Sequence, residues 1–356
     1  MRKLLLLGGC VVVVLALVVV LGLIIRNRAD RTDLTRALGV VPAQTQRLSF
    51  TDWSLVRHEL GVAADADPTP KSVTDWLNRA YDKDLSAAST IDQSAAALQK
   101  NYGFSPGNAQ WEAYAQSDKG AAMVLRLTDA VDFDVVAENL SAIGYQRPGS
   151  ATGVWNGGVD LVASLDSTLT PEMQYVVLLP KQHLVITSDT SSYAAIAGKA
   201  ARGKSKSLAD THSVTDMVGR IDEPAAATLW ARDFACSDLA MSQADPDAQK
   251  QANQLIRQAG TTSPLSGLVM ALAPDRVLTV AEEFDSGGQA RENLRARARL
   301  AVGTAVGRGE DTFDVDFKLV SSKAVGSTVL LGLRPRDAGV FPLSSLYDGP
   351  VIFATC

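Results

Sequence analysis

One unbroken apolar run near the start dominates the hydrophobic pattern of the chain. Residues Leu4–Ile25 contain no charged side chain, and basic residues lie on both sides of them. As a helix the run is about 22 residues, or roughly 33 Å, long enough to cross the hydrocarbon core of a bilayer. A cleaved signal peptide would have a shorter run followed by a small-residue cleavage site, whereas Arg-Asn-Arg stands at 26–28. We therefore predict that residues 1–28 form a transmembrane anchor.

A cysteine inside this run offers a second interpretation. Leu7-Gly8-Gly9-Cys10 is similar to the lipid-attachment box of bacterial lipoproteins. Most of the apolar run lies beyond Cys10, so processing there would leave the hydrophobic segment on the mature protein. We interpret Cys10 as a small apolar residue of the spanning helix.

Short polar phrases predict where helices begin after the anchor. Residues 29–70 are polar, and we predict a juxtamembrane segment of helix and linker that ends in a loop rich in Ala, Asp and Pro. Ser72 and Ser213 each precede an acidic residue by three positions, which is the arrangement of a helix N-cap. Large apolar residues follow such phrases and are expected in the core: Trp53, Trp76 and Met217.

Two stretches share one order of elements, namely a strand, a helix, a hairpin with a Pro-containing turn and an Ala-rich helix. The first stretch has these elements at 121–127, 131–143, 175–187 and 191–201. The second has them at 226–231, 245–259, 268–280 and 288–302. In the second, Asp245 before Pro246 is a strong helix start, and Gly260 is a natural stop.

This order predicts an α+β fold built as a tandem duplication of a strand-helix-hairpin-helix unit. One unit covers residues 71–205 and the other covers 206–356, each with an antiparallel sheet and helices on one face. Residues 312–319 alternate apolar and polar side chains, so a strand is expected there, paired with 327–333. Its inward side chains would be Phe313, Val315, Phe317 and Leu319.

Composition and charge narrow the function classes. The 356 residues are 46% hydrophobic and 21% charged, which is typical of a folded protein with a large core. The net charge is -5 and the pI about 5.3, with no long basic stripe. The chain thus lacks the electrostatic footprint of a nucleic-acid-binding protein, and no nucleic-acid partner is expected.

Cysteine usage indicates the compartment. Outside the anchor the chain has two cysteines, Cys236 and Cys356. Two cysteines permit one disulfide, which is expected in an oxidising, extracytoplasmic space. We predict a Cys236–Cys356 bond; two unrelated thiols are the alternative. Because basic residues flank both ends of the anchor, the cysteines rather than the charges favour an orientation with the bulk of the chain outside.

The sharpest motif match is Gly198–Ser205, which fits the phosphate-binding pattern G-x-x-x-x-G-K-[ST]. Such a loop requires a strand running into the first glycine and a helix after Lys-Ser. Here an Ala-rich helical segment comes first, and 206–210 is a poor helix start. We interpret the segment as a basic linker, whose charges could contact anionic lipid headgroups: Lys199, Arg202, Lys204 and Lys206.

Other candidate residues lack a recognisable chemistry. His58, His183 and His212 share no metal-ligand spacing. The acidic run lacks the spacing of a calcium loop: Glu310, Asp311, Asp314 and Asp316. We therefore assign no catalytic, cofactor-binding or metal-binding residue and expect no cofactor, while a site assembled from distant residues stays open.

Several features together resemble the uncharacterised, membrane-anchored extracytoplasmic proteins of the actinobacterial cell envelope. They are the anchor, the Thr-Asp-Trp phrase at 51–53, the stretch Leu179–Val185 and the late Cys356. The resemblance implies no activity. Our leading hypothesis is a single-pass plasma-membrane protein whose extracytoplasmic part binds an envelope protein, a lipid or a cell-wall component. The alternative is an envelope hydrolase with a dispersed site.

Overall fold

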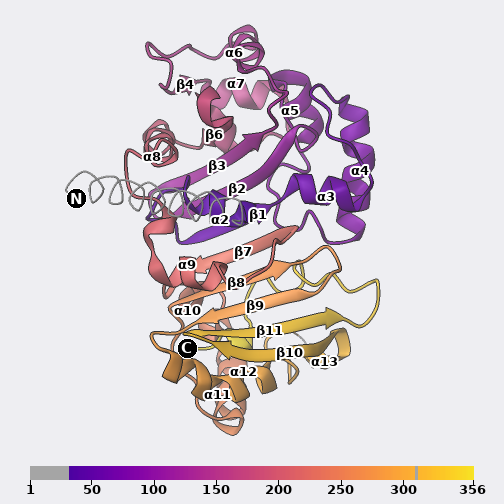
Figure 1. The fold of residues 1–356 in the computed structure, drawn as a ribbon, viewed down its shortest axis with the longest axis vertical. Helices are drawn as coiled ribbons and strands as arrows, with labels where there is room; N and C mark the ends of the chain where they lie inside the picture. Colours follow the sequence, from indigo (N-terminus) through magenta and orange to yellow (C-terminus); the bar gives the residue numbers. More distant parts are fainter. Residues whose placement is uncertain (1–31, 309–311) are drawn as a thin grey trace, which may run out of the picture.

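A single antiparallel sheet of eleven strands runs through the computed structural model, which describes residues 32–308 and 312–356 (Figure 1). The strands lie in the order β10-β11-β9-β8-β7-β1-β2-β3-β6-β5-β4. Their bounds are β1 Arg47–Thr51, β2 Ala109–Ser117, β3 Gly120–Leu127, β4 Trp155–Asn156, β5 Tyr175–Leu179, β6 Leu184–Ser188, β7 Ala226–Ala231, β8 Gly267–Leu272, β9 Leu278–Glu283, β10 Phe317–Val325 and β11 Thr328–Pro335.

The predicted anchor, residues 1–28, lies outside the described residues. Among the helices within 32–308 and 312–356, none has the length and apolar character needed to cross a membrane.

The sheet has the same strand connectivity on both sides of its centre, apart from the additional edge strand β4 of the first half. β1 pairs with β7, with Ser49 opposite Thr228. Outward from β1 come the hairpin β2–β3 and then the hairpin β5–β6, whose later strand is the inner one. Outward from β7 come the hairpin β8–β9 and then the hairpin β10–β11, again with the later strand inside. The two halves are therefore topologically alike and meet through their first strands.

This arrangement corrects two features of the predicted fold. The halves share one continuous sheet instead of having one sheet each. Strand 226–231 is the first of its half, so its counterpart is β1 at 47–51, which falls in the segment predicted as helix and linker, and not 121–127. β1 was missed because its five residues alternate polar and apolar side chains over too short a length to be distinguished from a linker.

Helices cover both faces of the sheet, whereas the prediction placed them on one. Their bounds are α2 Asp33–Leu38, α3 Trp53–Glu59, α4 Pro70–Asp82, α5 Ala95–Tyr102, α6 Phe133–Ala142, α7 Gly158–Leu165, α8 Ser191–Ala201, α9 His212–Val218, α10 Phe234–Asp238, α11 Pro246–Ala259, α12 Gly287–Leu300 and α13 Phe313–Asp316. On one face α2, α8 and α9 bury Leu34, Tyr193 and Val214 in the same core cluster as Phe50 of β1. The remaining helices cover the other face, which explains why strands such as β7 and β8 are buried at every position.

Helix boundaries follow the sequence signals in part. α11 begins at Pro246 as expected, and the Asp245 carboxylate accepts hydrogen bonds from two backbone N–H groups of its first turn. α4, however, begins one turn before the predicted cap Ser72, because Pro70 occupies the first helical position and Thr69 caps it. α9 likewise begins at His212, one residue before the predicted cap at 213. The predicted core residues are buried: Trp53, Trp76 and Met217.

The predicted strand at 312–319 is half wrong. Its first part forms the short helix α13, and β10 starts only at Phe317, opposite Pro335 at the end of β11. Phe313 packs edge-on against Phe353, with ring centroids 5.4 Å apart, whereas Val315 is 58% exposed. The tertiary contact and the end of the partner strand thus override the local alternation. The expected pairing of β10 with the strand after it is confirmed.

A disulfide holds the C-terminal segment against the second half. Cys236 of α10 is bonded to Cys356, the pair that the cysteine count predicts. Beside the bond, the fully buried Arg297 of α12 donates hydrogen bonds to the carbonyl oxygens of Phe353 and Thr355 at 2.7 and 2.6 Å. A covalent bond and a buried guanidinium therefore fix the same segment.

Replacing both Cys236 and Cys356 by serine should lower the free energy of unfolding by roughly 4–5 kcal/mol, because the bond closes a loop with a sequence separation of 120. Urea unfolding of the detergent-solubilised full chain measures this difference. Cys10→Ser leaves that loop closed and serves as the control. Equal stability of the double variant and the wild type would show that the cross-link does not constrain the unfolded chain.

Candidate functional site

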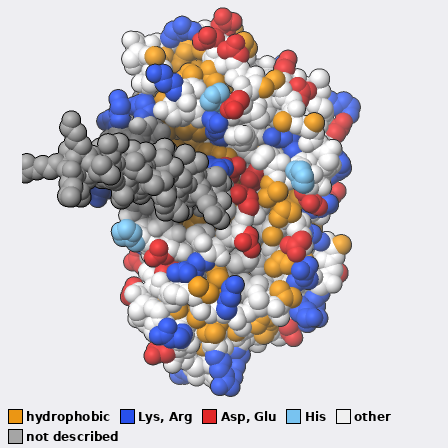
Figure 2. Space-filling view, viewed as in Figure 1, with side chains coloured by type: hydrophobic (Ala, Val, Ile, Leu, Met, Phe, Trp, Pro, Cys, Tyr) orange, Lys and Arg blue, Asp and Glu red, His pale blue; other side chains and the backbone are white. Residues whose placement is uncertain are grey.

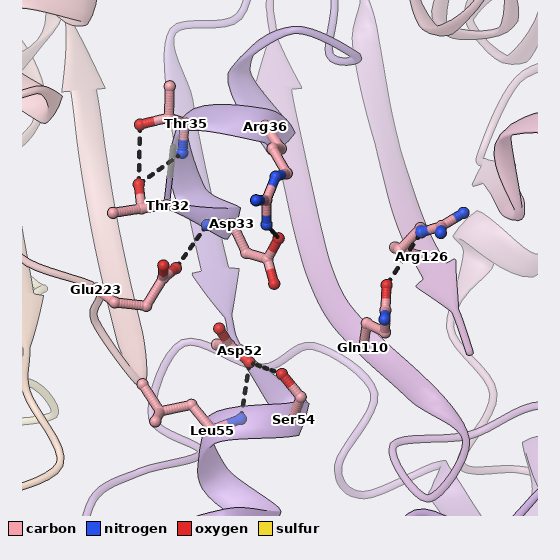
Figure 3. A network of polar contacts seen from close by, with 10 residues as sticks. All are labelled: Thr32, Asp33, Thr35, Arg36, Asp52, Ser54, Leu55, Gln110, Arg126 and Glu223. Atoms are coloured by element: carbon pink, nitrogen blue, oxygen red, sulfur yellow. Dashed lines mark hydrogen bonds and ion pairs between the residues drawn. The ribbon is translucent and has the colours of Figure 1, made fainter. Parts of the chain in front are cut away.

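Three carboxylates meet where α2 lies over the central strands (Figure 3). We call Asp33, Asp52 and Glu223 the carboxylate cluster; one oxygen of each lies within 4.8 Å of the others. Asp33 is the first residue of α2, Asp52 follows β1, and Glu223 lies between α9 and β7. Figure 2 shows Asp and Glu side chains gathered at the middle of this face. Asp33 and Asp52 come from the first half of the chain and Glu223 from the second, so the cluster involves both halves.

Backbone and side-chain contacts position each carboxylate. The Asp52 carboxylate accepts hydrogen bonds from the Leu55 backbone N–H at 2.8 Å and from the Ser54 hydroxyl at 2.6 Å, and so caps α3. Glu223 accepts a hydrogen bond of 2.6 Å from the Asp33 backbone N–H. The Asp33 carboxylate in turn forms an ion pair with Arg36, one turn along α2, at 2.5 Å. Each carboxylate therefore has a donor or a cation from its own chain.

Burial sets the charge state of the cluster. Desolvation raises the pKa of Asp52 above its ordinary value, although its hydrogen bonds from Ser54 and Leu55 act in the opposite direction. Burial also raises the pKa of Glu223 to about 7, and the negative charges of Asp52 and Asp33 add to that shift. Glu223 consequently exchanges a proton near neutral pH.

Chemically, such a cluster can share a proton or bind a hard cation. Carboxylate oxygens are the ligands that Ca²⁺ and Mg²⁺ prefer, so the residue types suit either ion. Contacts within the chain already compensate part of the negative charge of the cluster, because Arg36 forms an ion pair with Asp33 and Glu223 can be protonated.

The histidines and acidic residues considered in the sequence, none of which was assigned to a site, lie elsewhere. His58 is exposed on α3, and His212 is the first residue of α9. His183 lies in the β5–β6 turn, with its Nδ1 3.6 Å from Asp129 and its ring edge-on to Phe133. The structure thus brings none of the three histidines into the carboxylate cluster. Of the acidic run, Asp314 and Asp316 lie in α13, whereas Glu310 and Asp311 lie outside the described residues.

Sequence reasoning missed the carboxylate cluster. Asp52 belongs to the Thr-Asp-Trp phrase, which was interpreted only as a helix start. Glu223 and Asp33 are 190 positions apart, so no local spacing connects them. Only knowledge of the pairing of β1 with β7 could have indicated that these distant segments lie together.

The segment that matches the phosphate-binding pattern has the wrong geometry for it. Gly198 lies inside α8, and the chain leaves the helix at Gly203, which adopts a left-handed conformation at φ 66°. The backbone N–H groups of Gly203 and Lys204 donate back to the carbonyl oxygens of Ala200 and Lys199 at 2.8 and 2.9 Å. They therefore terminate a helix and do not cradle a phosphate, which requires free N–H groups before a helix N-terminus.

Two surface grooves are further candidate sites. One, of about 370 Å³, lies beside Trp76 and Arg79, and the other, of about 330 Å³, is lined by Phe133, Trp155 and Arg147. The Arg147 guanidinium covers the Trp155 ring at 5.1 Å from its centroid. Neither of these two grooves is lined by residues of the carboxylate cluster.

Comparisons with known proteins give a distant likeness of shape only. No protein-family model matches the sequence, and no curated protein matches it. A crystal form of the Treponema protein TP0453 matches with a TM-score of 0.40 and 8% identity, over 87% of this chain and 98% of that chain. A further crystal form of TP0453 matches with a TM-score of 0.39 and 9% identity, over 87% of this chain and 96% of that one. At such values the likeness carries no statement about function, and the resemblance to actinobacterial envelope proteins stays a prediction.

Glu223→Gln should remove one pH-dependent part of the stability. Because the pKa of Glu223 is about 7 in the folded protein and 4.5 in its ordinary state, its contribution is full below 4.5 and is lost as the pH rises through 7. Between pH 5 and 8 the wild type should thus lose about 1 kcal/mol more than the variant, a figure reduced for the partial exposure of the side chain.

Urea unfolding of both proteins across that pH range measures this difference. Glutamine can still accept the hydrogen bond from the Asp33 N–H, and Glu138→Gln, at an exposed position on α6, is the matched control. Parallel pH profiles of the wild type and Glu223→Gln would contradict the assignment.

Proposed function

We propose that this chain is a non-catalytic module of the cell envelope. Residues Leu4–Ile25 hold it in the plasma membrane as a single span, and the α+β body lies on the extracytoplasmic side. There it binds a partner close to the membrane, which is an envelope protein, a lipid or a cell-wall component.

The observation that carries this proposal is the Cys236–Cys356 disulfide. The two Cα atoms are 5.7 Å apart, the ordinary separation for a disulfide, so the fold brings the thiols together without displacement of the backbone. Disulfides persist in oxidising compartments and are rare in the cytosol. The bond therefore supports an extracytoplasmic position for the body that contains it.

The repeated strand connectivity supports a scaffold built by duplication. Each half has a first strand and two hairpins, and the two first strands pair at the centre. We include in the proposal that the body arose as a tandem duplication, with β1 and β7 as equivalent strands. The helix-covered sheet is the scaffold of the body, and its carboxylate cluster is engaged in contacts within the chain.

One observation favours the alternative, an envelope hydrolase. Glu223, with a pKa of about 7, lies beside Asp52 and Asp33, and a carboxylic acid next to carboxylates is an arrangement used in acid–base catalysis. A hydrolytic activity of the purified chain that Glu223→Gln abolishes, and that Glu138→Gln retains, would replace our proposal by this one.

Membrane fractionation tests the proposal itself. The full chain should stay in the membrane pellet after alkaline carbonate extraction, and deletion of residues 4–25 should release it, because the apolar run supplies the attachment. In intact cells the body should be digested by externally added protease, and Cys236 should be oxidised before lysis. Protection from the protease, or free thiols at both positions, would contradict the extracytoplasmic assignment.

A further inference from the structure

Charge of opposite sign lies at the two ends of the α2 segment. The carboxylate cluster lies at its start, where Asp33 opens the helix. At its end lies the basic loop, by which we mean residues 199–206 with Lys199, Arg202, Lys204 and Lys206. The protein as a whole is acidic, with a net charge of -5. The positive charge of this segment therefore differs from that of the chain as a whole.

Two contacts immediately after the basic loop join it to the chain that follows α2. The Leu208 backbone N–H donates to the carbonyl oxygen of Val41 at 3.1 Å, and Pro42 and Ser207 form an isolated antiparallel bridge. α2, α8 and α9 pack on the same face of the sheet, and the loop connects the last two (Figure 1). The basic loop therefore lies next to the first described segment of the chain, on the same face.

The lysines of the basic loop are available to an external partner. Lys199, Lys204 and Lys206 are exposed, and within the described residues none of them forms an ion pair. The nearby carboxylate of Asp210 accepts a hydrogen bond from the Ser207 backbone N–H at 2.8 Å. Figure 2 shows Lys and Arg side chains at the upper left of this face, near the position of α8 in Figure 1.

The length of the tether limits how far this face can be from the bilayer. Between Ile25, the end of the apolar run, and Thr32 there are about seven Cα–Cα steps, which span at most about 25 Å when fully extended. If the run spans the membrane, as proposed above, the start of α2 is held within that distance of the headgroups. The tether allows a closer approach, and within about a Debye length, roughly 8–10 Å, an anionic surface attracts the basic loop and repels the carboxylate cluster.

We propose that the basic loop is the surface through which the body contacts anionic lipid headgroups, with the carboxylate cluster turned away from the bilayer. The inference rests on the proposed membrane anchorage. Lysines suit this partner because each acts as a compact point charge on a flexible stem and needs no fixed geometry. A soluble anionic cell-wall polymer would need the same charges, and the experiment separates it from a bilayer.

The test uses the full chain reconstituted in vesicles of phosphatidylcholine, alone or with about 30% phosphatidylglycerol. Amine-reactive labelling, quantified by mass spectrometry, reports the accessibility of each lysine. Labelling of the three loop lysines should fall at least about threefold in the anionic vesicles and recover in about 1 M salt, which screens the attraction. Exposed lysines of the second half, Lys250, Lys318 and Lys323, are internal references and should be labelled equally in both.

Variants make the assignment specific. In the wild type, amide hydrogen exchange of residues 199–211 should be slower in anionic than in neutral vesicles. The triple variant Lys199→Gln, Lys204→Gln, Lys206→Gln should lose that difference. The control variant Lys250→Gln, Lys318→Gln, Lys323→Gln removes the same charge from exposed positions elsewhere and should keep it.

The outcomes distinguish this inference from the anchorage on which it rests. Vesicle flotation of the chain in both lipids, with equal loop labelling in both, would overturn the headgroup contact and leave the anchorage intact. Failure to float in either lipid would overturn the anchorage. Loop protection by soluble polyphosphate but not by anionic vesicles would assign the basic loop to a soluble polyanion and overturn the membrane contact.

Discussion

The antiparallel pairing of β1 with β7 is the constraint on which the rest of the structure depends. It joins two strand sets of like connectivity into one sheet, and it ends with Thr51 opposite Ala226. Immediately beyond that end, the Asp52 backbone N–H donates to the carbonyl oxygen of Ala225 at 2.8 Å. The residue after β1 and the segment before β7 are thereby brought to one point, which is why Asp52 and Glu223 become neighbours. Without this pairing there would be two half-sheets with exposed edges and no carboxylate cluster.

Within the described residues each half contains one glutamate with no exposed surface, and the surroundings of these two glutamates differ. Glu112 of β2 is fully buried and accepts hydrogen bonds from the Trp53 indole N–H at 3.2 Å and from the Thr90 backbone N–H at 2.7 Å. Glu282 of β9 is equally buried, but its neighbour is Arg297, with 3.7 Å between Oε2 and Nε. Burial raises the pKa of both glutamates to about 7. Halves with like connectivity have thus acquired different polar interiors, one hydrogen-bonded and one charge-paired.

The sequence indicates those elements whose signals are local. The apolar run of β5, the turn at Pro180 and the following strand were expected and are present, because a doubly covered strand is apolar at every position. β1 carries no such run, and its place at the centre is set by partners distant in the chain. The carboxylate cluster shares this limit, since its members come from segments that only strand pairing brings together. Cys236 and Cys356 could be paired because they are the only two cysteines outside the predicted anchor.

The position of α2 determines how a membrane tether would act on the body. α2 lies over the central strands and not at either end of the sheet. A force transmitted through Thr32 therefore reaches both halves near the β1–β7 pairing that joins them. The hydrogen bond from the Asp33 N–H to Glu223 is part of that connection, and it needs only an acceptor oxygen. A protonated Glu223 still offers such an oxygen, so the contact persists in either protonation state. What changes near neutral pH is the repulsion among Glu223, Asp52 and Asp33, so the cohesion of the two halves near β1 and β7 depends on the protonation of Glu223.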